Sequence, residues 1–269
     1  MGALGCRIDF FYILIKVERV EQISRKIINE ITGDTRKQKA VAIAVYLKKV
    51  CGRSSTIRDF NPYKIQKLTH IHPNTFKTYL PIMVDMGLVR FDGKNNEHLV
   101  ICRMRSRHIQ RNVDVHRFSY KSFKSVYHSL RAFLVLILQQ RKDFVYRTLQ
   151  IARNPKKGQD FKSARKTVKR LVKQGVLKSV FDSAKDFGLS YKRIAKEVGV
   201  CVRTAERVVA YALQKRWCRK QTHFTRVEMR GVNRMYVEGY TFTTRNYGFI
   251  VDANTYTLSE GIRRCLGMV

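Results

Sequence analysis

Apolar side chains recur at helical spacing near the start of the chain. Between Glu18 and Ile31 the apolar positions follow steps of three and four residues, which predicts a helix with one buried face. Residues 7–17 mix β-branched and aromatic side chains and predict a strand. The polar sequence around Gly33 ends the helical pattern, so we expect a first strand and helix segment over residues 1–38.

Residues 39–104 carry the pattern of three helices followed by two short strands. Asn61-Pro62 is a typical helix start, because proline fits the first helical position. Two β-type runs flank a polar loop that contains Gly93, which predicts a hairpin. Three helices are predicted: one over residues 39–50, one that starts at Pro62 and one that follows the turn at 70–74. Two strands are predicted over residues 87–91 and 98–102.

Residues 105–186 predict a basic helical connector. A long helix over 120–153 and a second one over 160–174 are separated by a Pro- and Gly-containing sequence at 154–158. Four aromatic side chains occur near the start of the long helix, and their helical spacing favours core packing over stacking on bases. They are Phe118, Tyr120, Phe123 and Tyr127.

From residue 187 the order of helices followed by strands recurs. The pattern is helical to about Trp217, and β-type runs follow at 223–229, 234–243 and 247–251. A turn is expected at 230–233, between the first two runs. The predicted fold class is therefore mainly α with short β-hairpins (α+β), with a last unit over residues 187–269.

The charge of the chain changes this picture most. Its 269 residues include 54 Lys and Arg against 20 Asp and Glu, a formal net charge of +34. A compact protein with this charge repels itself unless a polyanion neutralises it, and nucleic acid fits best. More than half of the excess lies in residues 103–178, with 21 basic and three acidic side chains. We expect phosphate contacts from Lys166, Lys169, Arg170 and Lys173.

A membrane surface is the rival polyanion, but the apolar runs Ile8–Val17 and Ala132–Leu138 fall short of the ~20 residues of a spanning helix. The start does not read as a signal peptide. We therefore expect no membrane partner and a cytoplasmic, nucleoid-associated location. The six cysteines are scattered, with no CxxC pair and no Cys/His cluster at zinc spacing. Reduced, packed thiols are favoured over a disulfide framework, and neither a metal site nor a cofactor is expected.

The segment Tyr191–Ala210, YKRIAKEVGVCVRTAERVVA, has the pattern of two short helices joined by a tight turn. Ser190 can cap the first helix, Ala195 is small where the helices cross, and Gly199 occupies the turn. The positions expected to be buried are Ile194, Val198, Val200, Ala205 and Val208. This segment resembles the helix-turn-helix family of DNA-binding domains, although an ordinary helical hairpin with a glycine cap has similar features.

The resemblance implies that the second helix enters the major groove of double-stranded DNA. Its exposed residues would then face base edges, and Arg203 and Arg207 could each reach guanine or phosphate. These residues are Cys201, Val202, Arg203, Thr204, Glu206 and Arg207. Phosphate contacts are expected from Lys192, Arg193 and Lys196 on the first helix. A basic wing is expected from Arg219, Lys220, Arg226, Arg230 and Arg234.

The unit at 39–104 is similar to the winged-helix branch of the same family. Ile65, Ile71, Phe76 and Tyr79 match its buried positions. Gln66 and His70 depart from its usual small residue and turn glycine, and Pro81 is expected to kink or end the third helix. The resemblance implies DNA contacts by His72, Asn74, Thr75, Lys77 and Thr78, with Lys94 at the tip of the wing. Otherwise this unit would serve dimerisation or packing, and a homodimer is compatible with the pattern.

Two such units loosely resemble replication initiators of plasmids and phages, and a transcription regulator fits the motifs nearly as well. Charge alone would also suit an architectural DNA-compaction protein. A third alternative is a rolling-circle nickase, because His70-Ile71-His72 fits the His-hydrophobic-His pattern, with Tyr120 or Tyr127 as nucleophile. That chemistry needs both histidines on one face of a strand. Since the surrounding sequence reads as helical, we expect DNA binding without catalysis.

Overall fold

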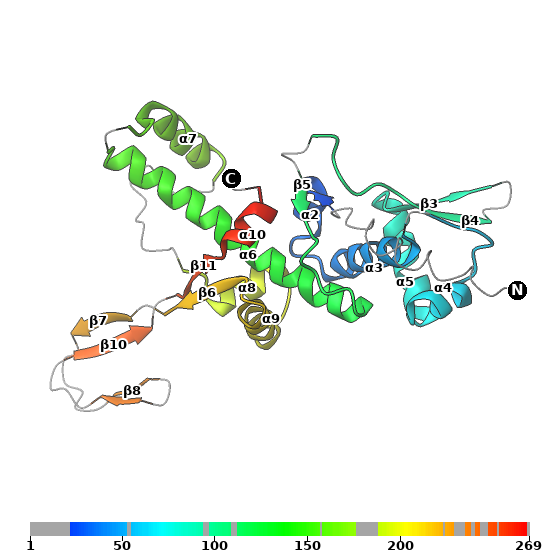
Figure 1. Cartoon of the computed structure of the whole chain (residues 1–269). Helices are drawn as coiled ribbons and strands as arrows, with labels where there is room; N and C mark the ends of the chain where they lie inside the picture. Colours follow the sequence, from blue (N-terminus) through cyan, green and yellow to red (C-terminus); the bar gives the residue numbers. More distant parts are fainter. Residues whose placement is uncertain are drawn as a thin grey trace, which may run out of the picture.

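The computed structural model describes residues 22–52, 55–93, 97–108, 112–156, 158–175, 188–222, 224–228, 235–237, 240–242, 247–251 and 253–267. Two helices, α3 (Thr35–Cys51) and α6 (Phe123–Arg153), pack against each other at the centre (Figure 1). Every residue of α3 from Ala40 to Leu47 is buried, because helices cover it on several sides. The fold is mixed α and β with small sheets, and no helix in the described part of the chain meets the length and apolarity that crossing a membrane requires.

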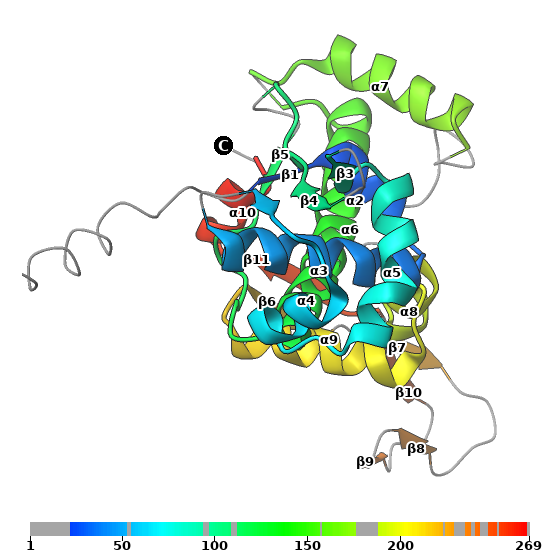
Figure 2. The same ribbon diagram turned by 90° about the vertical axis from the view of Figure 1, so that its right-hand side faces the viewer.

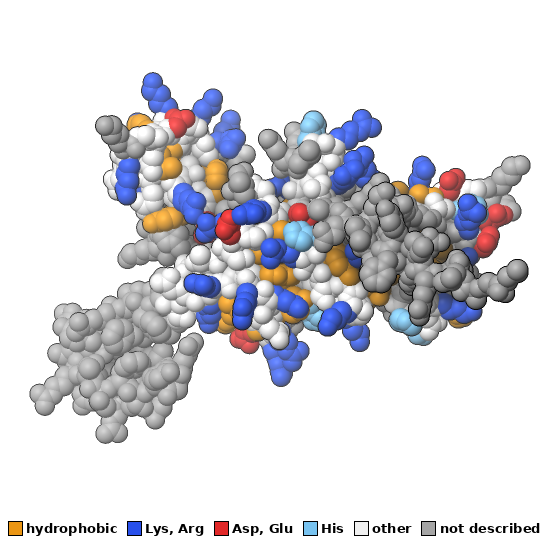
Figure 3. All heavy atoms as spheres, viewed as in Figure 1, with side chains coloured by type: hydrophobic (Ala, Val, Ile, Leu, Met, Phe, Trp, Pro, Cys, Tyr) orange, Lys and Arg blue, Asp and Glu red, His pale blue; other side chains and the backbone are white. Residues whose placement is uncertain are grey.

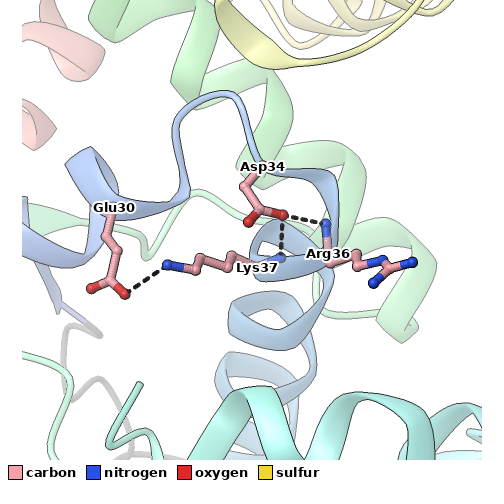
Figure 4. A network of polar contacts seen from close by, with 4 residues as sticks. All are labelled: Glu30, Asp34, Arg36 and Lys37. Carbon is pink, nitrogen blue, oxygen red and sulfur yellow. Dashed lines mark hydrogen bonds and ion pairs between the residues drawn. The ribbon is translucent and has the colours of Figure 1, made fainter. Parts of the chain in front are cut away.

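The start of α3 is fixed by a polar network (Figure 4). The carboxylate of Asp34 accepts hydrogen bonds from the backbone N–H groups of Arg36 and Lys37 at 2.9 and 3.0 Å. These bonds satisfy two of the free donors of the first helical turn. The Lys37 ammonium also forms an ion pair with Glu30 of α2 (Arg25–Ile31) at 3.1 Å. This ion pair connects α2 to α3 across the turn between them.

The predicted elements of the first unit are confirmed. α4 (Pro62–Thr69) begins at Asn61-Pro62, and the Asn61 side chain accepts from the Tyr63 N–H. α5 (Pro73–Asp85) follows, and then β3 (Val89–Asp92) pairs with β4 (His98–Ile101) as the expected hairpin. A short strand, β2 (Thr56–Ile57), adds to the other edge of β4 and gives the sheet order β2-β4-β3.

Two details differ from the prediction, one in this unit and one in the segment before it. Pro81 does not end α5, which continues for a further turn to Asp85. The helix predicted from Glu18 begins at Arg25, because Gln22–Ser24 instead form strand β1, paired with β5 (Asn112–Asp114). Ser24 caps α2 by accepting from the Ile27 N–H, and Ile23 is buried in the β1–β5 pair. The strand predicted at 7–17 lies outside the described residues.

The second unit consists of the first half of α6 with α8 (Tyr191–Val198), α9 (Val202–Gln214) and a β-ribbon (Figure 2). β6 (Cys218–Gln221) pairs with β11 (Thr255–Leu258), and β7 (Phe224–Glu228) pairs with β10 (Tyr247–Val251). The run predicted over 234–243 contains two paired strands, β8 (Met235–Val237) and β9 (Tyr240–Phe242), and the expected turn at 230–233 lies outside the described residues. In the described part of the chain β7 therefore pairs with β10, and not with the next strand as the turn expected at 230–233 had predicted.

The long helix predicted in the connector is present, but its first half belongs to the core. Val126, Leu130, Phe133 and Ile137 are buried in the part of α6 that packs against both α3 and α9. Beyond residue 140, α6 packs against α7 (Phe161–Lys173) around a separate small cluster, Leu149, Val168 and Leu171. The expected core packing of Phe118 and Tyr127 is confirmed. One hydrophobic core thus spans both units, and the far end of α6 with α7 projects from it on one side, as the β7–β10 ribbon does on another (Figure 1).

Candidate nucleic-acid interface

The α8–α9 pair has the local structure that its sequence predicts. The Ser190 hydroxyl accepts from the Arg193 N–H at 3.2 Å, and Gly199 takes the left-handed conformation with φ of 76°. Of the positions expected to be buried, Ile194, Val198, Ala205 and Val208 are buried and Val200 is half-buried. The turn therefore brings two short helices together at a fixed angle, with one shared apolar face.

The opposite face of α9 is open to solvent. Val202, Arg203, Glu206 and Arg207 are exposed, whereas Thr204 is half-buried. Among the described residues neither Arg203 nor Arg207 has an acidic partner within ion-pair distance. Both guanidinium groups are therefore available to an external anion.

Cys201 lies at the N-cap of α9 and is exposed. Its Sγ is 3.2 Å from the hydroxyl of Thr204, and hydrogen bonding to Thr204 lowers the pKa of the Cys201 thiol. The thiolate is the reactive form of cysteine. An exposed thiol with a lowered pKa thus lies at the start of the helix expected to meet DNA, where the resemblance had placed Cys201 among the exposed residues.

The cations expected to surround α9 fall into two groups. Lys192 and Lys196 are exposed on α8, whereas Arg193 forms an ion pair with Glu197 at 2.8 Å. Exposed pairs of this kind contribute little free energy, so the pair does not prevent Arg193 from binding phosphate.

Arg219 and Lys220 are exposed on β6, directly after α9. The Lys220 ammonium lies 5.4 Å above the ring of Tyr191 and 3.3 Å from its hydroxyl. Arg226 lies in β7, and Arg230 and Arg234 lie outside the described residues.

The α4–α5 pair repeats the arrangement with different residues. His70 occupies the left-handed turn position with φ of 57°, where the family usually has glycine. Ile71 is buried, and His72 caps α5 by accepting from the Asn74 N–H at 3.2 Å. Asn74, Lys77 and Thr78 are exposed on α5, Thr75 is half-buried, and Lys94 lies outside the described residues.

This turn also decides the geometry of the two histidines. His70 ends α4 and His72 precedes α5, so they do not lie on a strand. The metal-binding arrangement of the His-hydrophobic-His nickases, which requires two histidines on one strand face, is not formed at these positions.

The α8–α9 turn is held against the α2–α3 turn by close backbone contact. A Cβ added at Gly199 would lie 2.7 Å from the carbonyl carbon of Gly33, in the α2–α3 turn. Beside this contact the buried Gln38 amide donates to Val198 O at 2.7 Å and to Ile31 O at 3.2 Å. Its oxygen accepts from Arg131 of α6 at 3.2 Å. Sequence reasoning missed this junction, because Gln38 precedes the helix predicted over 39–50 and its partners lie in other elements.

The basic side chains of α7 lie elsewhere. Lys166, Lys169, Arg170 and Lys173 are all exposed, as a phosphate-binding role requires. Both ribbon views place α7 at the far end of α6, on the opposite side from α4 and α9 (Figures 1 and 2). Lys and Arg side chains mark both regions in Figure 3, with few acidic side chains between them. The structure therefore does not bring the α7 cations next to α9.

No family model, curated protein or solved structure matches this chain. What the two helix pairs do must therefore be inferred from their geometry and charge.

Proposed function

We propose that the protein binds double-stranded DNA through two helix-turn-helix units, with α9 as one recognition helix and α5 as the other. The observation that carries the proposal is the α8–α9 pair, whose turn, cap and buried face leave Arg203 and Arg207 exposed on the first two turns of α9, without an acidic partner among the described residues. Side chains at the start of such a helix are the ones that reach base edges in the major groove.

The order of elements supports extending the proposal to the first unit. Its succession α3, β2, α4, α5, β3, β4, with sheet order β2-β4-β3, is the order expected of a winged helix. In the second unit, α6, α8 and α9 are followed by a ribbon of two antiparallel chain segments. One segment contains β6 and β7, and the other contains β10 and β11, which pair with β7 and β6 respectively. In both units the ribbon would be the wing that flanks the groove.

We further propose a role as a replication initiator or transcription regulator of a phage or plasmid, acting at the nucleoid. A chain with two fused units can occupy two parts of one target site without dimerising. The rival function is non-specific DNA compaction, which the net charge of +34 favours.

The proposal is tested by fluorescence anisotropy with the full-length protein, a labelled duplex and the corresponding single strand. We expect the duplex to be preferred and log K to fall with log salt concentration by about 0.9 for each phosphate neutralised. Affinity that does not change between low and moderate salt would contradict nucleic acid as the main partner. Equal competition by target and scrambled duplexes would support compaction instead.

A further inference from the structure

Three side chains with metal-binding atoms meet where the end of the chain packs against β5. Asp114 ends β5, His116 follows it, and Cys265 lies on α10 (Glu260–Cys265). His116 Nδ1 is 2.8 Å from Asp114 Oδ1 and 3.9 Å from Cys265 Sγ, and all three atoms lie within 4.8 Å of one another. The contact between Cys265 and His116 joins residues 149 positions apart, so no sequence spacing could have indicated it.

The same three residue types form catalytic triads in cysteine hydrolases, but this geometry differs. A triad places the thiol on one ring nitrogen and the carboxylate on the other, so that the carboxylate orients the base. Here the carboxylate and the sulfur both approach Nδ1. Cys265 is also only 3% exposed, which leaves little room for a substrate carbonyl.

Convergence of three donor atoms on one point is instead what a metal ion requires. Zinc binds nitrogen and oxygen at about 2.0–2.2 Å and thiolate sulfur at about 2.3 Å, so its ligand atoms in a tetrahedral site lie roughly 3.3–3.7 Å apart. The observed separations of 2.8 and 3.9 Å lie on either side of that range. We propose that Asp114, His116 and Cys265 bind a Zn²⁺ ion.

Asp114 and Cys265 can together supply the negative charge that a divalent cation requires. Coordination forms a sulfur–zinc bond and releases the thiol proton to solvent. A carboxylate and a thiolate then neutralise the two charges of the ion. A sulfur ligand favours zinc over magnesium or calcium, which prefer oxygen.

A metal at this position would fasten the last helix to the middle of the chain. β5 pairs with β1, and Arg25 at the start of α2 donates a hydrogen bond to the Leu266 carbonyl beyond α10. An ion held by β5 and α10 would join the C-terminal end of the second unit to this strand pair. Because the proposed ion does not touch α5 or α9, the inference is independent of the proposed DNA binding.

The test is equilibrium dialysis of the reduced full-length protein against Zn²⁺, together with absorption spectra of the Co²⁺-loaded protein. We expect one ion per chain and a thiolate-to-cobalt charge-transfer band. Cys265→Ser and His116→Ala should each weaken zinc binding more than about 10-fold, since even outer-shell changes cost that much. Cys102→Ala and His128→Ala are the matched controls and should bind as the unchanged protein does.

Thermal unfolding of the metal-free variants shows whether each one folds. The proposal is overturned if the unchanged protein retains no zinc, or if folded Cys265→Ser keeps both the affinity and the charge-transfer band.

Discussion

Gly199 shows how one residue sets the position of the candidate recognition helix. It has a positive φ, and any side chain there would also press on the backbone of Gly33. We expect Gly199→Ala to destabilise the protein by more than the ~1–2 kcal/mol that left-handed backbone alone costs an L-residue. Gly199→Val should be worse, because its Cβ is branched. The measurement is the free energy of unfolding by urea.

Gly87→Ala is the matched control for this change. Gly87 also has a positive φ, of 63°, but a Cβ there would meet nothing within 4 Å. The difference between the two alanine variants therefore isolates the contact with Gly33. Equal destabilisation by both would show that the α2–α3 turn does not hold the α8–α9 turn in place.

Cys201 offers a chemical probe of the same site. Because Thr204 lowers its pKa while burial raises that of Cys51, more thiolate exists at Cys201 at any pH below the ordinary value of 9. We expect iodoacetamide to alkylate Cys201 before Cys51, with a half-maximal rate at lower pH, as read by peptide mass spectrometry. Saturating duplex DNA should slow the reaction at Cys201, and an unchanged rate would argue against α9 lying in the groove.

At the scale of elements, the local sequence correctly predicted a helix start, a hairpin and a break between two helices. Asn61-Pro62 marked the start of α4, Gly93 marked the β3–β4 hairpin, and Pro155 marked the break between α6 and α7. The failures are long-range. Whether Gln22–Ser24 form a strand depends on β5, about 90 residues later, and β7 pairs with β10 across the β8–β9 hairpin. Helical spacing alone cannot reveal such partners.

The candidate site divides in the same way. The buried and exposed faces of α9 follow from spacing within the helix, so the exposure of Arg203 and Arg207 was predictable. The contact of Gly199 with Gly33 and the bonds of Gln38 depend on how two units pack, which no local pattern encodes.

The role of α7 needs a test of its own, because this helix lies at the far end of α6 and not next to α9 (Figures 1 and 2). We expect replacement of Lys166, Lys169, Arg170 and Lys173 by alanine to weaken binding to all duplexes alike and to flatten the salt slope, because phosphate contacts do not read sequence. The matched control exchanges Lys for Arg and Arg for Lys at the same positions and should bind normally. Anisotropy with target and scrambled duplexes measures both quantities. Unchanged affinity would place α7 outside the interface, in keeping with its distance from α9.

At the scale of the whole molecule, the two units share one core around α3 and α6. A rigid connection of this kind fixes the distance and orientation between the two proposed recognition helices. The sequence predicted a basic helical connector over residues 105–186, whereas the first half of α6 lies inside the shared core. We therefore expect the two halves of a DNA target to be separated by one constant length.

Selection of bound duplexes from a random pool, carried out in parallel with the unchanged protein and Arg203→Ala, tests this expectation. We predict two half-sites at fixed spacing for the unchanged protein. Arg203→Ala should relax one base position by about 1–3 kcal/mol, because its guanidinium can bond two acceptors of one guanine. Sequence-independent retention of the pool, or identical base preferences for the two proteins, would contradict DNA reading by α9.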